Sequence, residues 1–280
     1  MHLDFTVYFD YIFLYQTAIG SVYSMRFIDG IYKPCVEKCN SIQDIQRVLR
    51  ILDNGKAVLD DERKCDLYIA FYGGHHFHKL YAAFASTNFP HTESKDIEII
   101  DWGCGQALAT CVLIDYLMEN NINPNIVSVT LIEPSLIALN RGYNFTRQML
   151  QSTFSSSCTL RKVNKYINDL TSNDLASEMG TIKVHLFSNI IDVEAFCLND
   201  LHRLMLASFR GYNRLICTSP DNDGKYRLGD FYNLFSQSCQ VFNSASSDEP
   251  IYQEIFYFKN KQYERCRIGR CERQFSVNLT

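Results

Sequence analysis

From residue 96 onward, short apolar runs alternate with stretches of helical periodicity. Apolar runs predict strands at 97–100, 127–132, 160–166, 182–187 and 214–218, and helical spacing predicts helices at 107–118, 135–149, 198–209 and 226–236. Strands that alternate with helices predict a parallel sheet covered on both faces. Two late runs, 251–258 and 274–278, have no helix between them. The pattern therefore predicts an α/β fold, with a doubly wound, mostly parallel sheet and an antiparallel edge hairpin at the C-terminus.

Residues 1–95 have a different texture. The opening segment is dense in Phe and Tyr without a clear period, so it predicts no element. Apolar residues at helical spacing predict a helix over 41–54, with Ser41 as N-cap and Asp44 at the third helical position. A second helix is predicted over 76–86. These features predict a mainly helical N-terminal cap over 1–95, packed on an α/β domain over 96–280.

The most informative stretch is the glycine turn that follows the strand at 97–100. It reads Asp-Trp-Gly-Cys-Gly-Gln-Ala over 101–107 and leads into a helix. Glycine is needed where the backbone approaches a ligand or takes a positive φ. In open parallel sheets, ligands bind in the crevice beyond the carboxyl ends of the strands. Leu108 stands where a dinucleotide-binding fingerprint would need its third glycine.

This turn resembles motif I of the class I methyltransferases that use S-adenosylmethionine (SAM), written (D/E)-x-G-x-G-x-G, with Ala107 at the last glycine. The resemblance implies a Rossmann-like domain that binds SAM. The residues of the turn that it assigns to the cofactor are Asp101, Gly103, Cys104 and Gly105.

Two later acids match positions that the family uses for the cofactor. Glu133 follows the strand at 127–132, where the family holds the ribose hydroxyls with a carboxylate. Asp169 follows the third strand, where the family has an acidic or amide residue near the adenine amino group. The resemblance therefore implies ribose contact through Glu133 and adenine contact through Asp169.

The segment after the fourth strand, 185–192, corresponds to the family's variable motif beside the transferred methyl group. It lacks the (D/N/S)-P-P-(Y/F) signature of amino-group methylation. Ser188 is a candidate cofactor contact, and Asn189 and Asp192 are candidate catalytic residues. The segment also looks like one in uncharacterised bacterial methyltransferase-like proteins, which resemble this chain over roughly 68–220 and imply no substrate.

Three of the seven histidines cluster at His75, His76 and His78. Helix neighbours at this spacing do not all face one way and no carboxylate partner is evident, so no metal site is predicted. His76 is a third catalytic candidate, as a contact to cofactor or substrate. Ordinary surface or half-buried histidines are the alternative.

The charge pattern limits the partners. The net charge of −4 argues against a general polyanion binder. Segment 259–273 nevertheless carries six basic and two acidic residues. As an exposed hairpin tip, this segment is either a solvated turn or a site that binds nucleic acid, with an affinity that falls as the salt concentration rises.

The eleven cysteines cannot all pair internally because their number is odd. The chain shows no CxxC pair, no basic signal-peptide region and no apolar run long enough for a membrane span. These features predict free thiols, a cytoplasmic location and no membrane contact.

Three functional hypotheses follow. The first is a SAM-dependent methyltransferase acting on an unidentified substrate. The second is a non-catalytic sensor or structural subunit that holds SAM or a nucleotide on the same fold. The third is a nucleotide-processing enzyme, because a fold does not fix a function.

Overall fold

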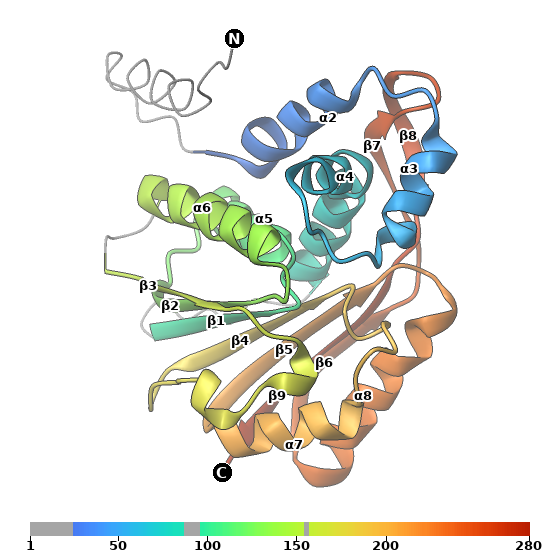
Figure 1. Ribbon diagram of the computed structural model, residues 1–280. Coiled ribbons are helices and arrows are strands. Elements are labelled where there is room, and N and C mark those ends of the chain that lie inside the picture. The colour runs from blue at the N-terminus through green and yellow to red at the C-terminus, as the bar shows by residue number, and fades with distance from the viewer. Residues whose placement is uncertain (1–24, 87–95, 154–156) are drawn as a thin grey trace.

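The computed structural model describes residues 25–86, 96–153 and 157–280. Its centre is a seven-stranded sheet of order β3-β2-β1-β4-β5-β9-β6 (Figure 1). The strands are β1 Asp96–Trp102, β2 Asn125–Ile132, β3 Thr159–Val163, β4 Ile182–Ser188, β5 Gly211–Ser219, β6 Val241–Ser247 and β9 Cys271–Leu279.

Strands β1 to β5 are parallel, and β9 is antiparallel to both of its neighbours, β5 and β6. Strand β6 is therefore parallel to β5. Without β9 the order is 3-2-1-4-5-6, that of the doubly wound dinucleotide-binding folds. The predicted Rossmann-like α/β fold is confirmed.

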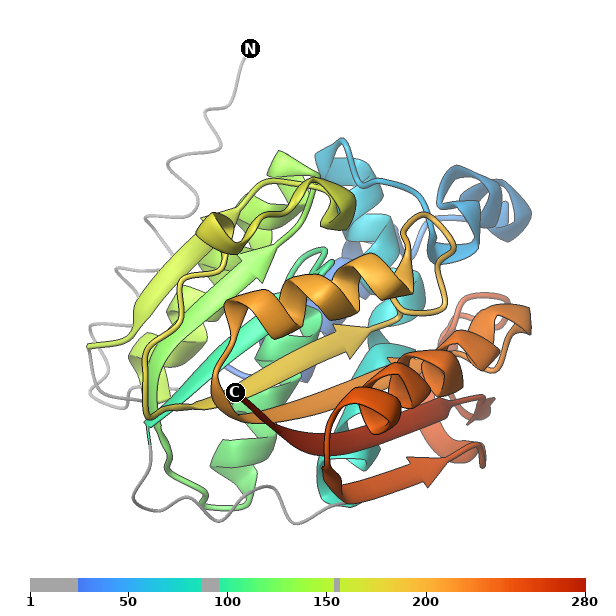
Figure 2. The ribbon, with the colours of Figure 1, turned by 90° about the horizontal axis from the view of Figure 1, so that it is seen from below.

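Helices cover both faces of this sheet, as Figures 1 and 2 show. On one face lie α4 Glu62–Ser86, α5 Leu108–Glu119 and α6 Leu136–Thr153, and on the other lie α7 Leu198–Ser208 and α8 Tyr226–Ser238. Each face buries its own apolar cluster. The central strands are buried on both sides, which explains why they appear in the sequence as nearly continuous apolar runs.

Residues 25–86 form helical elements that join the first of these clusters. Before α4 they are η1 Phe27–Tyr32, α2 Lys33–Cys39, α3 Ile45–Ile51 and η2 Asp53–Gly55. The helix predicted over 41–54 is shorter than expected. Its N-cap is Asp44, which accepts a hydrogen bond from the Arg47 backbone N–H at 2.9 Å, and not Ser41. The aromatic opening lies outside the described residues, and the division at 95 stays a prediction.

Helix α4 is much longer than the helix predicted over 76–86. Its middle contains Gly73 and Gly74, which weaken the helical signal in the sequence. A Cβ at Gly74 would lie 2.9 Å from both the Tyr32 hydroxyl and Ile255 Cγ2. The glycine pair therefore lets the N-terminal elements and a late hairpin pack closely on α4.

The late hairpin consists of β7 Ile251–Tyr257 and β8 Gln262–Ile268, which form a separate two-stranded antiparallel sheet. An antiparallel hairpin was predicted here, but 274–278 is not its second strand, because β9 belongs to the main sheet. Segment 259–273 is likewise not a free tip. The Phe258 ring next to the turn stacks on Phe71 of α4, with centroids 4.0 Å apart.

The remaining short elements are the 3-10 turns η3 Ile167–Asp169, η4 Ser172–Asp174 and η5 Asp223–Lys225. All eleven cysteines lie in the described part of the chain as free thiols. Across 25–86, 96–153 and 157–280, no helix combines the length and apolar character that crossing a membrane requires.

Candidate functional site

The glycine turn between β1 and α5 takes a left-handed backbone at three positions. The φ angles are +58° at Gly103, +51° at Gly105 and +57° at Ala107. A Cβ on Gly105 would meet no atom within 4 Å, so the turn is open there. Over Gly103 it is closed, because a Cβ would lie 2.7 Å from Ile190 Cδ1. The open side at Gly105 is where a ligand can approach the backbone.

Close packing of α6 supports this turn. A Cβ on Gly142 would lie 2.7 Å from the Gln106 carbonyl carbon and 2.9 Å from Ala107 Cβ. Ala107 replaces the third glycine of the family motif, and Gly142 supplies the space that its side chain occupies. The departure from the motif is therefore accommodated by the neighbouring helix.

The carboxyl group of Asp101 is buried beneath the turn. It accepts hydrogen bonds from the Thr110 backbone N–H at 3.2 Å and from the Thr110 hydroxyl at 2.7 Å. Burial raises the pKa of Asp101 to about 7, partly offset by these two bonds. Asp101 thus takes one of the N–H donors in the first turn of α5, the kind of helix end at which a phosphate otherwise binds.

Glu133, at the end of β2, lies directly against the turn. Its carboxylate accepts from the Gly105 N–H at 3.0 Å and from the Ser135 N–H at 2.9 Å. Burial raises the pKa of Glu133, and these bonds oppose the rise. Cys104 is buried beside it, and its backbone N–H donates to Ile132 O at 2.9 Å, which joins the turn to β2.

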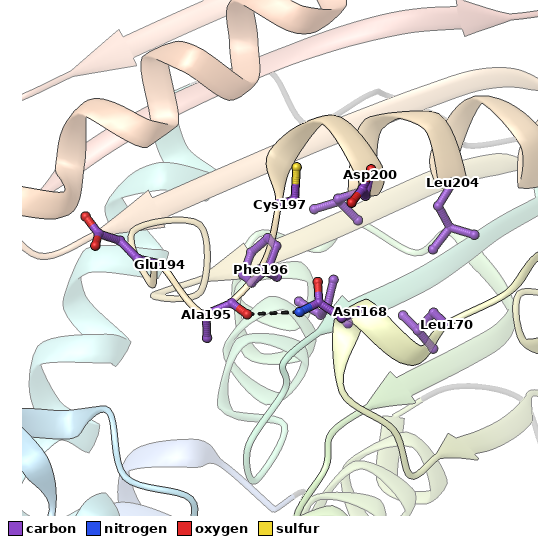
Figure 3. A pocket seen from close by; sticks show the side chains of 10 residues that line it. Asn168, Leu170, Glu194, Ala195, Phe196, Cys197, Asp200 and Leu204 are labelled. Atoms are coloured by element: carbon purple, nitrogen blue, oxygen red, sulfur yellow. Dashed lines mark hydrogen bonds between the residues drawn. The ribbon is translucent and has the colours of Figure 1, made fainter.

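Asp169 lies apart from this cluster. It is exposed in η3, beyond the end of β3. Its neighbour Asn168 donates to the carbonyl of Ala195 at 3.0 Å, and both residues line a cavity of about 480 Å³. Figure 3 shows Asn168 of η3 turned toward Ala195 in the segment that leads into α7.

A second cavity, of about 370 Å³, lies between α4, the ends of β4 and β5, and the turn between β8 and β9. All three catalytic candidates of the sequence, His76, Asn189 and Asp192, line it. The cavity is also lined by Lys56, Tyr68, Tyr72, His75, Lys79, Asp221, Asn222 and Arg267.

Asn189 connects α4 to the end of β4. Its side-chain oxygen accepts a hydrogen bond from the Lys79 ammonium, and its Nδ2 lies 2.9 Å from His76 Nε2. The other ring nitrogen of His76 lies 3.5 Å from the hydroxyl of Ser188, and the hydroxyl of Tyr68 is 3.1 Å from Nε2. A neutral imidazole with its proton on Nδ1 satisfies these contacts. Burial lowers the pKa of His76 well below its usual value.

Lys79 is a candidate functional residue that sequence reasoning missed. Its side chain is buried, with 3% of the residue exposed. Burial lowers the pKa of Lys79 to about 7, although Asp192 and Cys271 act in the opposite direction. A large fraction of this amine is therefore unprotonated near neutral pH. The only signal in the sequence is the three-residue spacing from His76, which places both side chains on one side of α4.

Two of the residues that line this cavity each have a buried polar atom without a partner. Asp192 accepts from Asn222 Nδ2 at 2.8 Å through one oxygen. Its other oxygen, Oδ1, and the hydroxyl of Tyr72 are buried without a hydrogen-bond partner among the residues described. Buried polar atoms are nearly always paired, so this combination indicates a place for a polar ligand.

Tyr68, which lines this cavity, is also close enough to the glycine turn to be influenced by Glu133. Burial raises the pKa of the Tyr68 hydroxyl, and the carboxylates of Glu133 and Asp192 both add to that rise. Tyr68 therefore lies within electrostatic reach of both sites. Asn189 and Ile190 make the same connection along the chain, because Asn189 lines the cavity and Ile190 covers Gly103.

The basic segment 259–273 is partly neutralised by ion pairs. Arg270 pairs with Glu272 at 3.0 Å, and Arg273 with Asp248 at 2.7 Å. Arg267 lies 3.7 Å from Asp221 at the edge of the 370 Å³ cavity. The contact to nucleic acid stays a prediction, and these pairs reduce the charge it would use. In the described ranges, no group of three or more His, Cys, Asp or Glu side chains is arranged to hold a metal ion.

No protein-family model and no curated protein matches the sequence. Solved structures with similar folds include a SAM-dependent O-methyltransferase from Thermotoga maritima, with 9% identity over 83% of this chain and 71% of that one, at a TM-score of 0.43. A precorrin-6y C5,15-methyltransferase from Geobacter metallireducens has 13% identity over 71% and 87%, at a TM-score of 0.40. A SAM-dependent methyltransferase from Leishmania major has 11% identity over 94% and 89%, at a TM-score of 0.39. By its strand order and its glycine turn, the chain has the Rossmann-like fold of the class I SAM-dependent methyltransferases.

Proposed function

We propose that this protein is a SAM-dependent methyltransferase whose cofactor lies in the crevice between the glycine turn and Glu133. The observation that carries the proposal is the Glu133 carboxylate, fixed by the N–H groups of Gly105 and Ser135 next to the open side of the turn. An ionised carboxylate has about four acceptor sites. Two therefore remain for the vicinal hydroxyls of a ribose.

The chemistry of the crevice fits SAM better than a nucleotide with phosphate groups. The Asp101 carboxyl already takes an N–H donor in the first turn of α5. A pyrophosphate placed there would compete with that group, whereas SAM carries no phosphate. This contrast favours the methyltransferase over a nucleotide-processing enzyme.

The two cavities suggest how the rest of the reaction is arranged. The cavity in Figure 3 borders Leu170 and Phe196 and offers apolar surface for the adenine ring, with Asp169 in the same turn as Asn168. The 370 Å³ cavity on the Lys79 side takes the methyl acceptor. Bound SAM supplies an activated methyl group, so the protein mainly aligns the acceptor and excludes water. The ionisable groups in the acceptor cavity favour an enzyme over a sensor.

We expect Glu133→Ala to weaken binding of S-adenosylhomocysteine by roughly 1.5–3 kcal/mol, because charged hydrogen bonds to the ribose are lost. That corresponds to an increase in Kd of roughly 10- to 150-fold. Isothermal titration calorimetry measures it. Glu133→Gln keeps the shape and should lose less.

Glu119→Ala is the control. Glu119 is the last residue of α5, and its partly exposed carboxylate pairs with Arg26. The variant should bind like the wild type. If a folded Glu133→Ala protein binds S-adenosylhomocysteine as tightly as the wild type, Glu133 does not hold the ribose.

A further inference from the structure

We propose that the 370 Å³ cavity binds a small aromatic acceptor bearing a hydroxyl group, and that Lys79 takes the proton of this hydroxyl as the methyl group is transferred. This inference rests on the proposed function, because it names the acceptor class and the proton acceptor of the same reaction. It is carried by the position of Lys79 in a cavity that Asp192 also lines, where the Lys79 ammonium is held by Asn189 and one Asp192 oxygen has no partner.

The wall of the cavity that α4 forms is aromatic. Tyr68 and Tyr72 have ring centroids 5.3 Å apart, and Tyr68 and His76 have centroids 5.6 Å apart. Such a wall suits a flat ring with a polar edge. The volume of about 370 Å³ lies toward the small end of the range for small-molecule sites.

The edge of this cavity does not favour a polynucleotide. Arg267 pairs with Asp221 there, which leaves Lys56 as the other basic side chain at the edge. Phosphate contacts need several basic groups that are free to bind. A free small molecule is therefore the better occupant.

The unpaired polar atoms of Asp192 and Tyr72 favour an acceptor that carries a hydroxyl group. Asp192 Oδ1 can accept a hydrogen bond from a substrate hydroxyl, and the Tyr72 hydroxyl can donate one to a substrate oxygen. A hydroxyl held in this way also needs a proton acceptor. His76 is poorly suited, since its nitrogens already contact Asn189, Tyr68 and Ser188.

Lys79 meets the requirements for this role. The groups that act on it are His75 and His76 on α4, Asn189 and Asp192 from the β4 side, and Cys271 at the start of β9. Burial is the dominant effect and lowers the pKa of Lys79 to about 7. Asn189 accepts one N–H of the amine, which holds it at the cavity.

The pKa of the acceptor hydroxyl must be low enough for the Lys79 amine to take its proton. A phenolic hydroxyl has a pKa near 10, within reach of an amine with a pKa of about 7. An aliphatic alcohol is far less acidic, and an aliphatic amine would enter as a second cation. In the transfer, the hydroxyl oxygen forms a bond to the methyl carbon. The carbon–sulfur bond breaks, with its electron pair passing to the sulfur, and the hydroxyl proton passes to the Lys79 nitrogen.

Salicylaldehyde tests the cavity without the cofactor. Its aldehyde forms an imine with an unprotonated amine and releases water, and cyanoborohydride reduces the imine to a stable label. At pH 7.5 we expect Lys79 to be labelled at least about tenfold faster than Lys64, an ion-paired lysine near the start of α4, because far more of its amine is unprotonated. Peptide mass spectrometry measures both rates, and excess catechol should protect Lys79. Labelling of Lys79 no faster than Lys64, or no protection by catechol, would overturn the inference.

A second experiment separates this inference from the proposed function. With SAM and catechol, Lys79→Arg should lower kcat at least about 100-fold, because an arginine cannot take the proton. Its affinity for S-adenosylhomocysteine should stay within about twofold. Lys183→Arg is the control, because Lys183 is also buried but lies in β4, outside the cavity. Normal S-adenosylhomocysteine binding without protection or turnover of catechol would sink only the inference, whereas failure of that binding in the wild type would sink the proposed function.

Discussion

Gly142→Ala is expected to destabilise the protein by about 3 kcal/mol, the upper part of the usual range for overpacking. The new Cβ would lie 2.7 Å from a backbone carbon of Gln106 and 2.9 Å from the Ala107 nitrogen. Backbone cannot rotate away as a flexible side chain can, so α6 or the glycine turn must shift. Urea unfolding measures the loss, and S-adenosylhomocysteine affinity should fall in parallel because the turn forms the crevice.

Gly229→Ala is the matched control for this substitution. Gly229 also lies inside a helix, α8, but a Cβ there would meet nothing within 4 Å. We expect it to stabilise the protein by roughly 0.5–1 kcal/mol, because alanine favours a helix over glycine. Equal effects of the two substitutions would contradict the close packing of α6 on the turn.

Lys79→Met is expected to raise the free energy of unfolding by roughly 4 kcal/mol at pH 7. In the folded protein burial lowers the pKa of Lys79 from 10.5 to about 7. Between these values the unfolded chain binds a proton that the folded chain does not, so wild-type stability from this group rises with pH. The cost is complete below pH 7 and disappears near pH 10.5. Methionine removes it.

Urea unfolding of both proteins from pH 6 to pH 10 tests this prediction. The gap between them should be widest at or below pH 7 and should narrow as the pH rises. Burial also lowers the pKa of His75 and of His76, and because both proteins keep these histidines, their contribution below about pH 6.5 is largely common to the two curves. A constant gap over the whole range would show that Lys79 has an ordinary pKa.

The strands that form the centre of the sheet could be predicted because each is buried on both faces. The runs at 97–100 and 127–132 contain mostly apolar residues for this reason. Strands β6 and β8 were missed because their sequences are largely polar or charged, and many of their residues are exposed. Their pairing with β9 and β7 depends on contacts that no local pattern encodes.

The sequence predicts the glycine turn and Glu133, but it does not predict the burial of Lys79. The glycine turn is a local motif, and Glu133 follows a strand that the pattern predicts. The burial of Lys79 is not local, because Asn189 and Asp192 approach it only when α4 packs across the ends of β4 and β5. In the sequence alone, a lysine late in a helix has the appearance of a surface residue.

Cofactor identity tests the central claim most directly. Isothermal titration calorimetry of the wild-type protein with SAM, S-adenosylhomocysteine, NAD and ATP compares the four ligands under one condition. We expect SAM and S-adenosylhomocysteine to bind at one site per chain, and NAD and ATP to bind much more weakly because Asp101 takes an N–H donor in the first turn of α5. Binding of NAD or ATP with no heat from SAM would contradict this expectation.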